Sequence, residues 1–162
     1  MRTPLLLALP LLAACASAPK PAATAAPAVT GAIQYEGQFR PIQQNDGRLG
    51  MNTTQRIFGS VQVIFRESSG KSSIRLSLTT NANASEVLSW AIVPGRCGNG
   101  AIPVLPAAQF PPLELSNNGS GEVNAAEMQV ALPPSAYHVN VYRGGETLAN
   151  VIACANLNQR DR

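Results

Sequence analysis

Histidine is the scarcest reactive residue in this sequence of 162 residues, which contains one, His138. A metal site built from several imidazoles therefore cannot be assembled within one chain. His138 alternates with apolar residues in a strand-like segment, and we expect it on the outward, solvent-exposed face. Charged residues make up 13% of the chain, aromatic residues make up 5%, and the basic residues form no run. A nucleic-acid-binding protein needs a basic stripe, so nucleic acid is not an expected partner.

The common catalytic motifs are also missing from the sequence. No serine has a Gly-x-Ser-x-Gly context, and there is neither a glycine-rich phosphate loop nor a Cys-x-x-Cys pair. Four glutamates could supply a pair of carboxylates, but their spacing singles out no two of them: Glu114, Glu122, Glu127 and Glu146. We therefore expect no enzymatic activity, no cofactor and no metal ligand.

The sequence has no apolar run long enough to span a membrane. Its longest apolar run lies at the start of the chain. Arg2 precedes a run of leucines and alanines that ends in small residues near position 14. A basic start, a short apolar centre and a small-residue end are typical of a secretory signal, and the run is too short to span a bilayer. We expect residues 1–14 to be this signal.

The end of the signal, Leu12-Ala13-Ala14-Cys15, resembles the lipobox of bacterial lipoproteins. The resemblance implies that Cys15 is diacylated, becomes the N-terminus and anchors the protein in a membrane, because two or more acyl chains bind durably. It also implies an outer-membrane lipoprotein facing the periplasm, since Ala16 stands where an inner-membrane retention signal has aspartate. Surface exposure stays open, and the alternative to lipidation is an ordinary signal peptide with a chance cysteine.

The remainder of the chain divides by composition into a linker and one domain. Residues 15–30 are proline- and alanine-rich, which favours a polyproline II spacer reaching up to about 45 Å at roughly 3.1 Å per residue. Residues 31–158 have the size of a single domain, and residues 159–162 form a polar tail.

Alternation of apolar and polar residues predicts that this domain is all-β. The clearest case places Ile74, Leu76 and Leu78 on one face and polar residues on the other. The segment Ser68–Lys71 before it has the composition of a hairpin turn. Seven or eight strands at hairpin spacing predict an antiparallel Greek-key β-sandwich or flattened barrel. The other segments that predict strands are 33–39, 56–67, 87–93, 122–132, 137–142 and 147–157.

Cys97 and Cys154 are the two cysteines left once Cys15 is assigned to lipid. An even pair in an exported protein is most simply a disulfide. The alternative is two free, buried thiols.

Three segments resemble the Cu/Zn superoxide dismutase-like Greek-key sandwich and its chordin-type (CHRD) relatives: Trp90–Gly98, Tyr137–Tyr142 and Val151–Leu157. The resemblance implies the fold and a disulfide between a loop cysteine and a last-strand cysteine, here Cys97 and Cys154. It does not extend to the metal site. Ala91-Ile92-Val93 stands where the family has a His-x-His pair, and Tyr142 lies near the position of a further histidine.

These features predict a lipid-anchored, non-catalytic interaction or structural module whose partner is an envelope protein or ligand. The alternatives are a metal-binding or superoxide dismutase-like protein with a rebuilt site, and a protein that binds a ligand between its sheets. The segment 96–112 is the candidate contact loop because it is more apolar than a connector requires. Its apolar side chains either contact a partner or cover the open edge of the barrel. The candidate residues are Arg96, Ile102, Val104, Leu105 and Phe110.

Overall fold

The computed structural model describes residues 31–42, 56–81 and 85–160. The predicted signal, the lipobox with Cys15 and the linker lie outside these residues. The described part of the chain contains nine β-strands and two single-turn 3₁₀ helices. Their bounds are β1 (Ala32–Gln38), β2 (Arg40–Pro41), β3 (Ile57–Arg66), β4 (Lys71–Thr80), β5 (Glu86–Pro94), η1 (Ala107–Gln109), β6 (Leu113–Leu115), β7 (Ser120–Met128), β8 (Tyr137–Tyr142), η2 (Leu148–Asn150) and β9 (Val151–Gln159).

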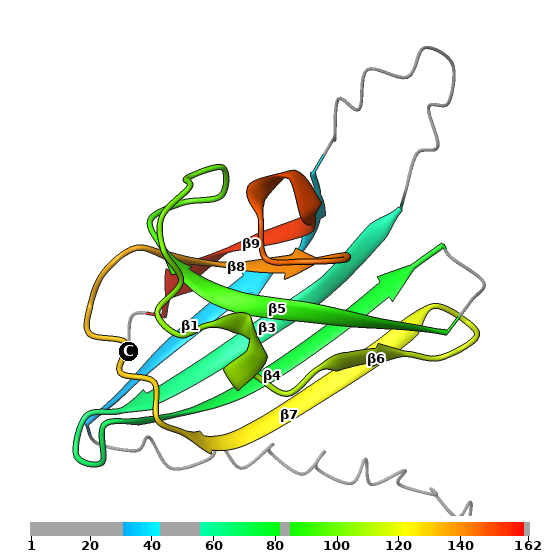
Figure 1. Ribbon diagram of the computed structural model, residues 1–162. Helices are drawn as coiled ribbons and strands as arrows, with labels where there is room; N and C mark the ends of the chain where they lie inside the picture. The colour runs from blue at the N-terminus through cyan, green and yellow to red at the C-terminus, as the bar shows by residue number, and fades with distance from the viewer. Residues whose placement is uncertain (1–30, 43–55, 82–84, 161–162) are drawn as a thin grey trace, which may run out of the picture.

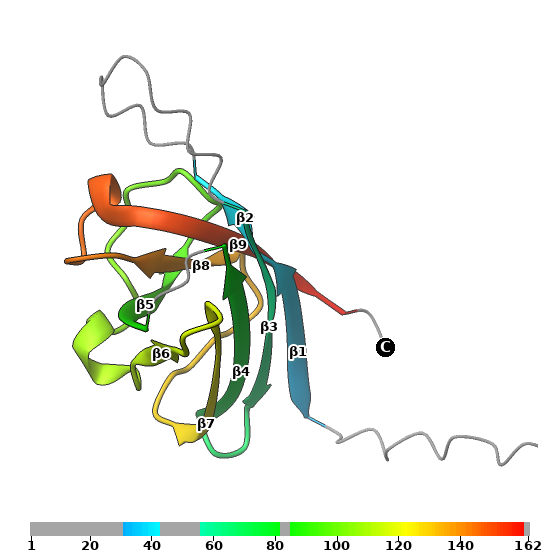
Figure 2. The same cartoon turned by 90° about the vertical axis from the view of Figure 1, so that its right-hand side faces the viewer.

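The strands form one antiparallel sheet in the order β6-β5-β8-β9-β1-β3-β4-β7, with β2 paired to β9. The sheet bends back on itself, so that β5, β8 and β9 lie across β1, β3, β4 and β7 (Figures 1 and 2). The turn between β6 and β7 nearly closes the barrel, because Ser116 N donates to Ser120 O over 2.9 Å. Strands β5, β6 and β7 follow one another and β4 lies beside β7, which is a Greek-key arrangement. The predicted fold class is confirmed.

The β1-β3-β4-β7 layer keeps the alternation seen in the sequence. Ile74, Leu76 and Leu78 of β4 are buried, whereas the residues between them are partly or fully exposed. Cross-strand neighbours share this pattern: Val61 of β3 pairs with Leu76, and both are buried. A strand with one buried face needs this period of two, which is why these strands were predictable.

Strands β5, β8 and β9 lose the alternation where both of their faces are covered, which is the case for all of β8, for residues 90–93 of β5 and for residues 151–155 of β9. All six residues of β8 are buried. Trp90 of β5 points into the barrel, where its ring packs on Phe110 with 4.5 Å between centroids and Nε1 donates to Pro111 O over 2.7 Å. The opposite face of this layer lies under the loop that follows β5, and Val104 N in that loop donates to Ile92 O over 2.9 Å.

Two predicted strand boundaries are wrong for local backbone reasons. The predicted strand 122–132 runs from Ser120 to Met128, because the pairing with β4 shifts register near its end and Glu127 adopts a positive φ of 59°. The last strand begins at Val151 rather than at residue 147, because residues 148–150 form η2. It also continues through Gln159, so the predicted polar tail starts inside the sheet.

Two ion pairs connect the irregular end of β7 to the ends of β3 and β4. Glu127 forms ion pairs with Arg66 Nη1 at 3.3 Å and with Lys71 Nζ at 3.1 Å. These three side chains therefore gather at one corner of β7, the last strand of the sheet. No helix among the described residues is long and apolar enough to cross a membrane.

Candidate functional site

A groove of about 730 Å³ follows the outer surface along the line where β1 meets β9. We call it the basic groove. It is lined by residues 36–38 and 40–42 of the β1–β2 segment, 96–97 of the loop after β5, 136–137 at the start of β8, and 154 and 156–160 of β9. Its volume falls within the range of small-molecule sites in proteins.

The pairing of β1 and β2 with β9 builds the floor of the basic groove. Glu36 pairs with Asn158, and Arg40 pairs with Cys154 in the same register. Between these pairs the strands approach closely at Gly37, where a Cβ atom would lie 2.6 Å from the carbonyl oxygen of Asn156. Glycine is the residue that permits such a backbone approach.

The Cys97–Cys154 disulfide fixes the wall of the groove to its floor. The two Cα atoms lie 5.9 Å apart, and Cys97 N donates to Asn156 Oδ1 over 2.8 Å. Arg96 precedes Cys97 in the chain, whereas Arg40 is the cross-strand partner of Cys154. The disulfide, which the sequence predicted, therefore brings the backbone at Arg96 close to the strand pair that contains Arg40.

The arginines of the groove differ in their partners. Arg160 Nη2 lies 2.8 Å from Glu36 Oε2 in an ion pair at one end of the groove. Arg40 and Arg96 are exposed and form no ion pair with any residue in the described ranges. The lining residues thus contribute three arginines and one glutamate, a surplus of positive charge in a concave surface.

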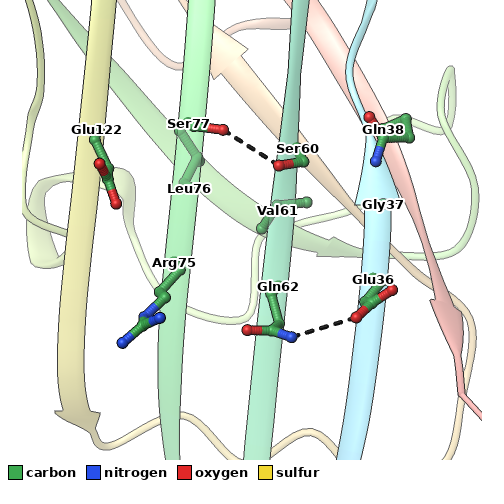
Figure 3. A pocket seen from close by; sticks show the side chains of 10 residues that line it. All are labelled: Glu36, Gly37, Gln38, Ser60, Val61, Gln62, Arg75, Leu76, Ser77 and Glu122. Carbon is green, nitrogen blue, oxygen red and sulfur yellow. Dashed lines mark hydrogen bonds between the residues drawn. The ribbon is translucent and has the colours of Figure 1, made fainter. Parts of the chain in front are cut away.

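A second, shallower hollow of about 350 Å³ adjoins the basic groove and shares Glu36, Gly37 and Gln38 with it. Figure 3 shows its side chains on four neighbouring strands, with Ser60 hydrogen-bonded to Ser77 and Gln62 to Glu36. Arg75 and Glu122 complete its charged lining. The hydroxyl, amide and charged groups form a polar outer face that continues from β7 to β9.

The predicted contact loop is divided by the structure. Phe110 is buried, and Val104 and Leu105 pack against the core, so these three side chains cover the barrel. Ile102 is 87% exposed and available for contact. Arg96 is exposed and belongs to the basic groove.

His138 is completely buried, so the expectation of a surface histidine is wrong. The loop after β5 covers it: His138 Nδ1 lies 3.0 Å from Gly95 O. A carbonyl oxygen only accepts hydrogen bonds, so Nδ1 carries the proton and the neutral ring leaves a lone pair on Nε2. Nε2 has no hydrogen-bond partner within the described part of the chain. Burial lowers the pKa of His138 below its ordinary value of 6.5, and the bond to Gly95 opposes this shift only in part.

The domain should therefore lose stability as the pH falls below about 6.5. The unfolded chain takes up a proton at histidine in this range before the folded protein does, so the free energy of unfolding falls toward the lowered folded-state pKa. The slope is at most about 1.4 kcal/mol per pH unit. Urea unfolding from pH 7.5 to 5 would measure it, with His138→Gln as the control, because the chain has no other histidine. Equal slopes for the two proteins would show that His138 does not titrate on unfolding.

The positions that resemble the dismutase copper strand are buried in the sheet. Ala91 and Val93 are fully covered side chains of β5. Tyr142 is buried on β8, and its hydroxyl accepts a hydrogen bond of 3.4 Å from Asn140 Nδ2. Burial raises the pKa of Tyr142, which keeps the phenol protonated. Within the described ranges, no three histidine, cysteine or acidic side chains gather in a way that could hold a metal ion.

Sequence reasoning missed the basic groove. Arg40, Arg96 and Arg160 are far apart in the sequence and share no motif, so the register of β9 and the disulfide bring them together. The one available signal was the position of Arg96 next to a cysteine expected to pair with a cysteine of the last strand.

No family model matches this chain, and no curated protein shows a significant match to it.

Proposed function

We propose that this chain is a lipid-anchored, non-catalytic binding module of the bacterial envelope. The observation that carries the proposal is the chemistry of the two adjoining hollows. Arginine, amide and hydroxyl side chains make up about half of the lining residues, beside two glutamates and several apolar side chains. The arginine, amide and hydroxyl groups recognise ligands well but are weak nucleophiles and weak bases at neutral pH. The one histidine lies under a loop and is bonded to a backbone carbonyl.

The anchor in this proposal rests on the sequence Leu12-Ala13-Ala14-Cys15 and on the short apolar run before it. Two or three acyl chains on Cys15 would hold the protein on the membrane, with residues 16–30 as the spacer before the domain. Ala16 supports placement in the outer membrane, facing the periplasm. The second half of the proposal, a binding role, rests on the folded domain alone.

The anchor is tested by replacing the cysteine that would carry the lipid. Cells that express the wild type should incorporate a fatty-acid probe into the protein, because the lipid is expected on the sulfur of Cys15. The Cys15→Ser variant should lose both the label and membrane association, and Ser17→Ala should keep both. A labelled Cys15→Ser protein would contradict lipidation at this residue.

A further inference from the structure

The two arginines at the disulfide end of the basic groove, Arg40 and Arg96, form no ion pair with the residues that the structure describes. At the other end of the groove, Arg160 is neutralised by Glu36, whose Oε1 also accepts a bond of 2.9 Å from Gln34 Nε2. Glu36 is therefore engaged, and Arg40 and Arg96 have no ion-pair partner in the parts of the chain that the structure describes. Two exposed guanidinium groups in one concave surface attract anions.

Hydrogen bonds and the disulfide hold the backbone at both of these arginines. Arg40 lies on β2, where the next residues continue the pairing and Ile42 N donates to Ile152 O over 3.0 Å. Arg96 lies between Gly95, whose N donates to Ala136 O over 2.8 Å, and Cys97, which is bonded covalently to Cys154. A site with a fixed backbone loses less entropy on binding than a site on a free loop.

Uncharged polar side chains line the groove as well, beside several apolar residues. Gln38, Asn156 and Asn158 present side-chain amides, and Asn156 uses its Oδ1 to accept from Cys97 N, which leaves its amide hydrogens for other partners. The one aromatic lining residue, Tyr137, is buried at 7% exposure, so its ring offers no open face for stacking. Recognition in this groove therefore relies on charge and hydrogen bonds.

We propose that the basic groove binds an acidic sugar, in which phosphate or carboxylate oxygens contact Arg40 and Arg96 and hydroxyl groups contact the neighbouring amides. Guanidinium groups bind both kinds of oxyanion with paired hydrogen bonds. Amide side chains donate to and accept from hydroxyl groups, which suits the remainder of a sugar ring. This inference rests on the proposed binding role and names the ligand class of that role.

Calorimetric titration of the full chain, purified in a neutral detergent, would test the assignment. Glucose 6-phosphate and glucuronate should bind, inorganic phosphate should bind more weakly, and glucose should show no measurable heat. Arg40→Gln and Arg96→Gln should each weaken binding of the acidic sugars about tenfold or more, the usual effect of losing a charge-assisted hydrogen bond. Arg56→Gln is the matched control, since Arg56 is an exposed arginine that lines neither hollow, and it should leave the affinity unchanged.

Glu36→Gln should change affinity in the opposite direction. Removing this carboxylate frees the Arg160 guanidinium and removes the one negative charge among the lining residues that the structure describes, so acidic sugars should bind several-fold more tightly. An equal loss of affinity in Arg56→Gln and Arg40→Gln would show that the binding is general attraction to a positively charged protein, and would overturn the assignment. Binding of glucose as tight as that of glucose 6-phosphate would overturn it too.

The two proposals fail separately. A protein that carries the fatty-acid label at Cys15 and binds none of the acidic sugars would refute the acidic-sugar site while leaving the anchored module in place. A protein that binds them through Arg40 and Arg96 but takes up no label would refute the anchor and support the groove.

Discussion

Replacing Trp90 with alanine is expected to lower the free energy of unfolding by about 3–5 kcal/mol, the usual cost of removing a large aromatic side chain from a core. Trp90 is completely buried, and its ring fills the space between β5 and Phe110. The substitution would also leave Pro111 O without the indole donor that bonds it. Because η1 and Phe110 close the barrel from this side, the loss should loosen the covering loop as well as the sheet.

Urea unfolding followed by far-ultraviolet circular dichroism would measure this effect, because the variant has no tryptophan left for fluorescence. Phe58→Ala is the matched control: it removes an aromatic ring from the same barrel, but Phe58 is 59% exposed on the outer face of β3. The control should cost less than about 1 kcal/mol, since little apolar area is lost from the interior. A Trp90→Ala protein as stable as the control would show that the core does not depend on this ring.

Removing the disulfide is the other change with a large expected effect. Cys97 and Cys154 are separated by 57 positions, and the chain-entropy treatment of a loop of that length gives about 4 kcal/mol. The double variant Cys97→Ser/Cys154→Ser avoids a leftover thiol and should lose about this much stability. Arg96 and its neighbours would then be held to β9 chiefly by the bond from Cys97 N to Asn156 Oδ1.

Reductant provides an independent check on this second effect. The wild type in excess dithiothreitol should unfold at the same urea concentration as the double variant, and reductant should not move the midpoint of the variant. Cys15→Ser should behave like the wild type, because Cys15 is not part of the bridge. Equal stability of the reduced and oxidised wild type would contradict a stabilising role for the disulfide.

The strands that could be predicted are those with one solvent-exposed face and one buried face. In β4 the sequence itself alternates, because each outward residue meets water and each inward residue meets the core. The six buried residues of β8 include His138 and Asn140. Their polar side chains alternate with apolar ones, which predicts an exposed face, but a loop covers this face in the structure. The interior position of His138 depends on a loop more than 30 residues earlier in the chain, and local periodicity contains no information about such a contact.

The contact loop illustrates the same limit. Its apolar composition predicted either contact or cover. Phe110 covers the barrel, whereas Ile102 is exposed, and its contact with a partner stays a prediction. The disulfide was predictable from the count of cysteines and the expected export. The basic groove required the register that places Arg40 opposite Cys154, and a strand of two residues leaves no periodicity from which to infer a register.

The charged corner of β7 affects how copies of this protein would associate at high local concentration. A straight edge strand offers its free N–H and C=O groups to the edge of another molecule and can start open-ended association. Here the register shift opposite Ser72 and the positive φ of Glu127 bend the edge, and Arg66, Lys71 and Glu127 place charges beside the bend. The proposed lipid anchor would confine the molecules to the plane of a membrane, where they would meet more often than in dilute solution. A bent, charged edge would keep such neighbours from joining into a shared sheet, and crowded copies would stay separate particles.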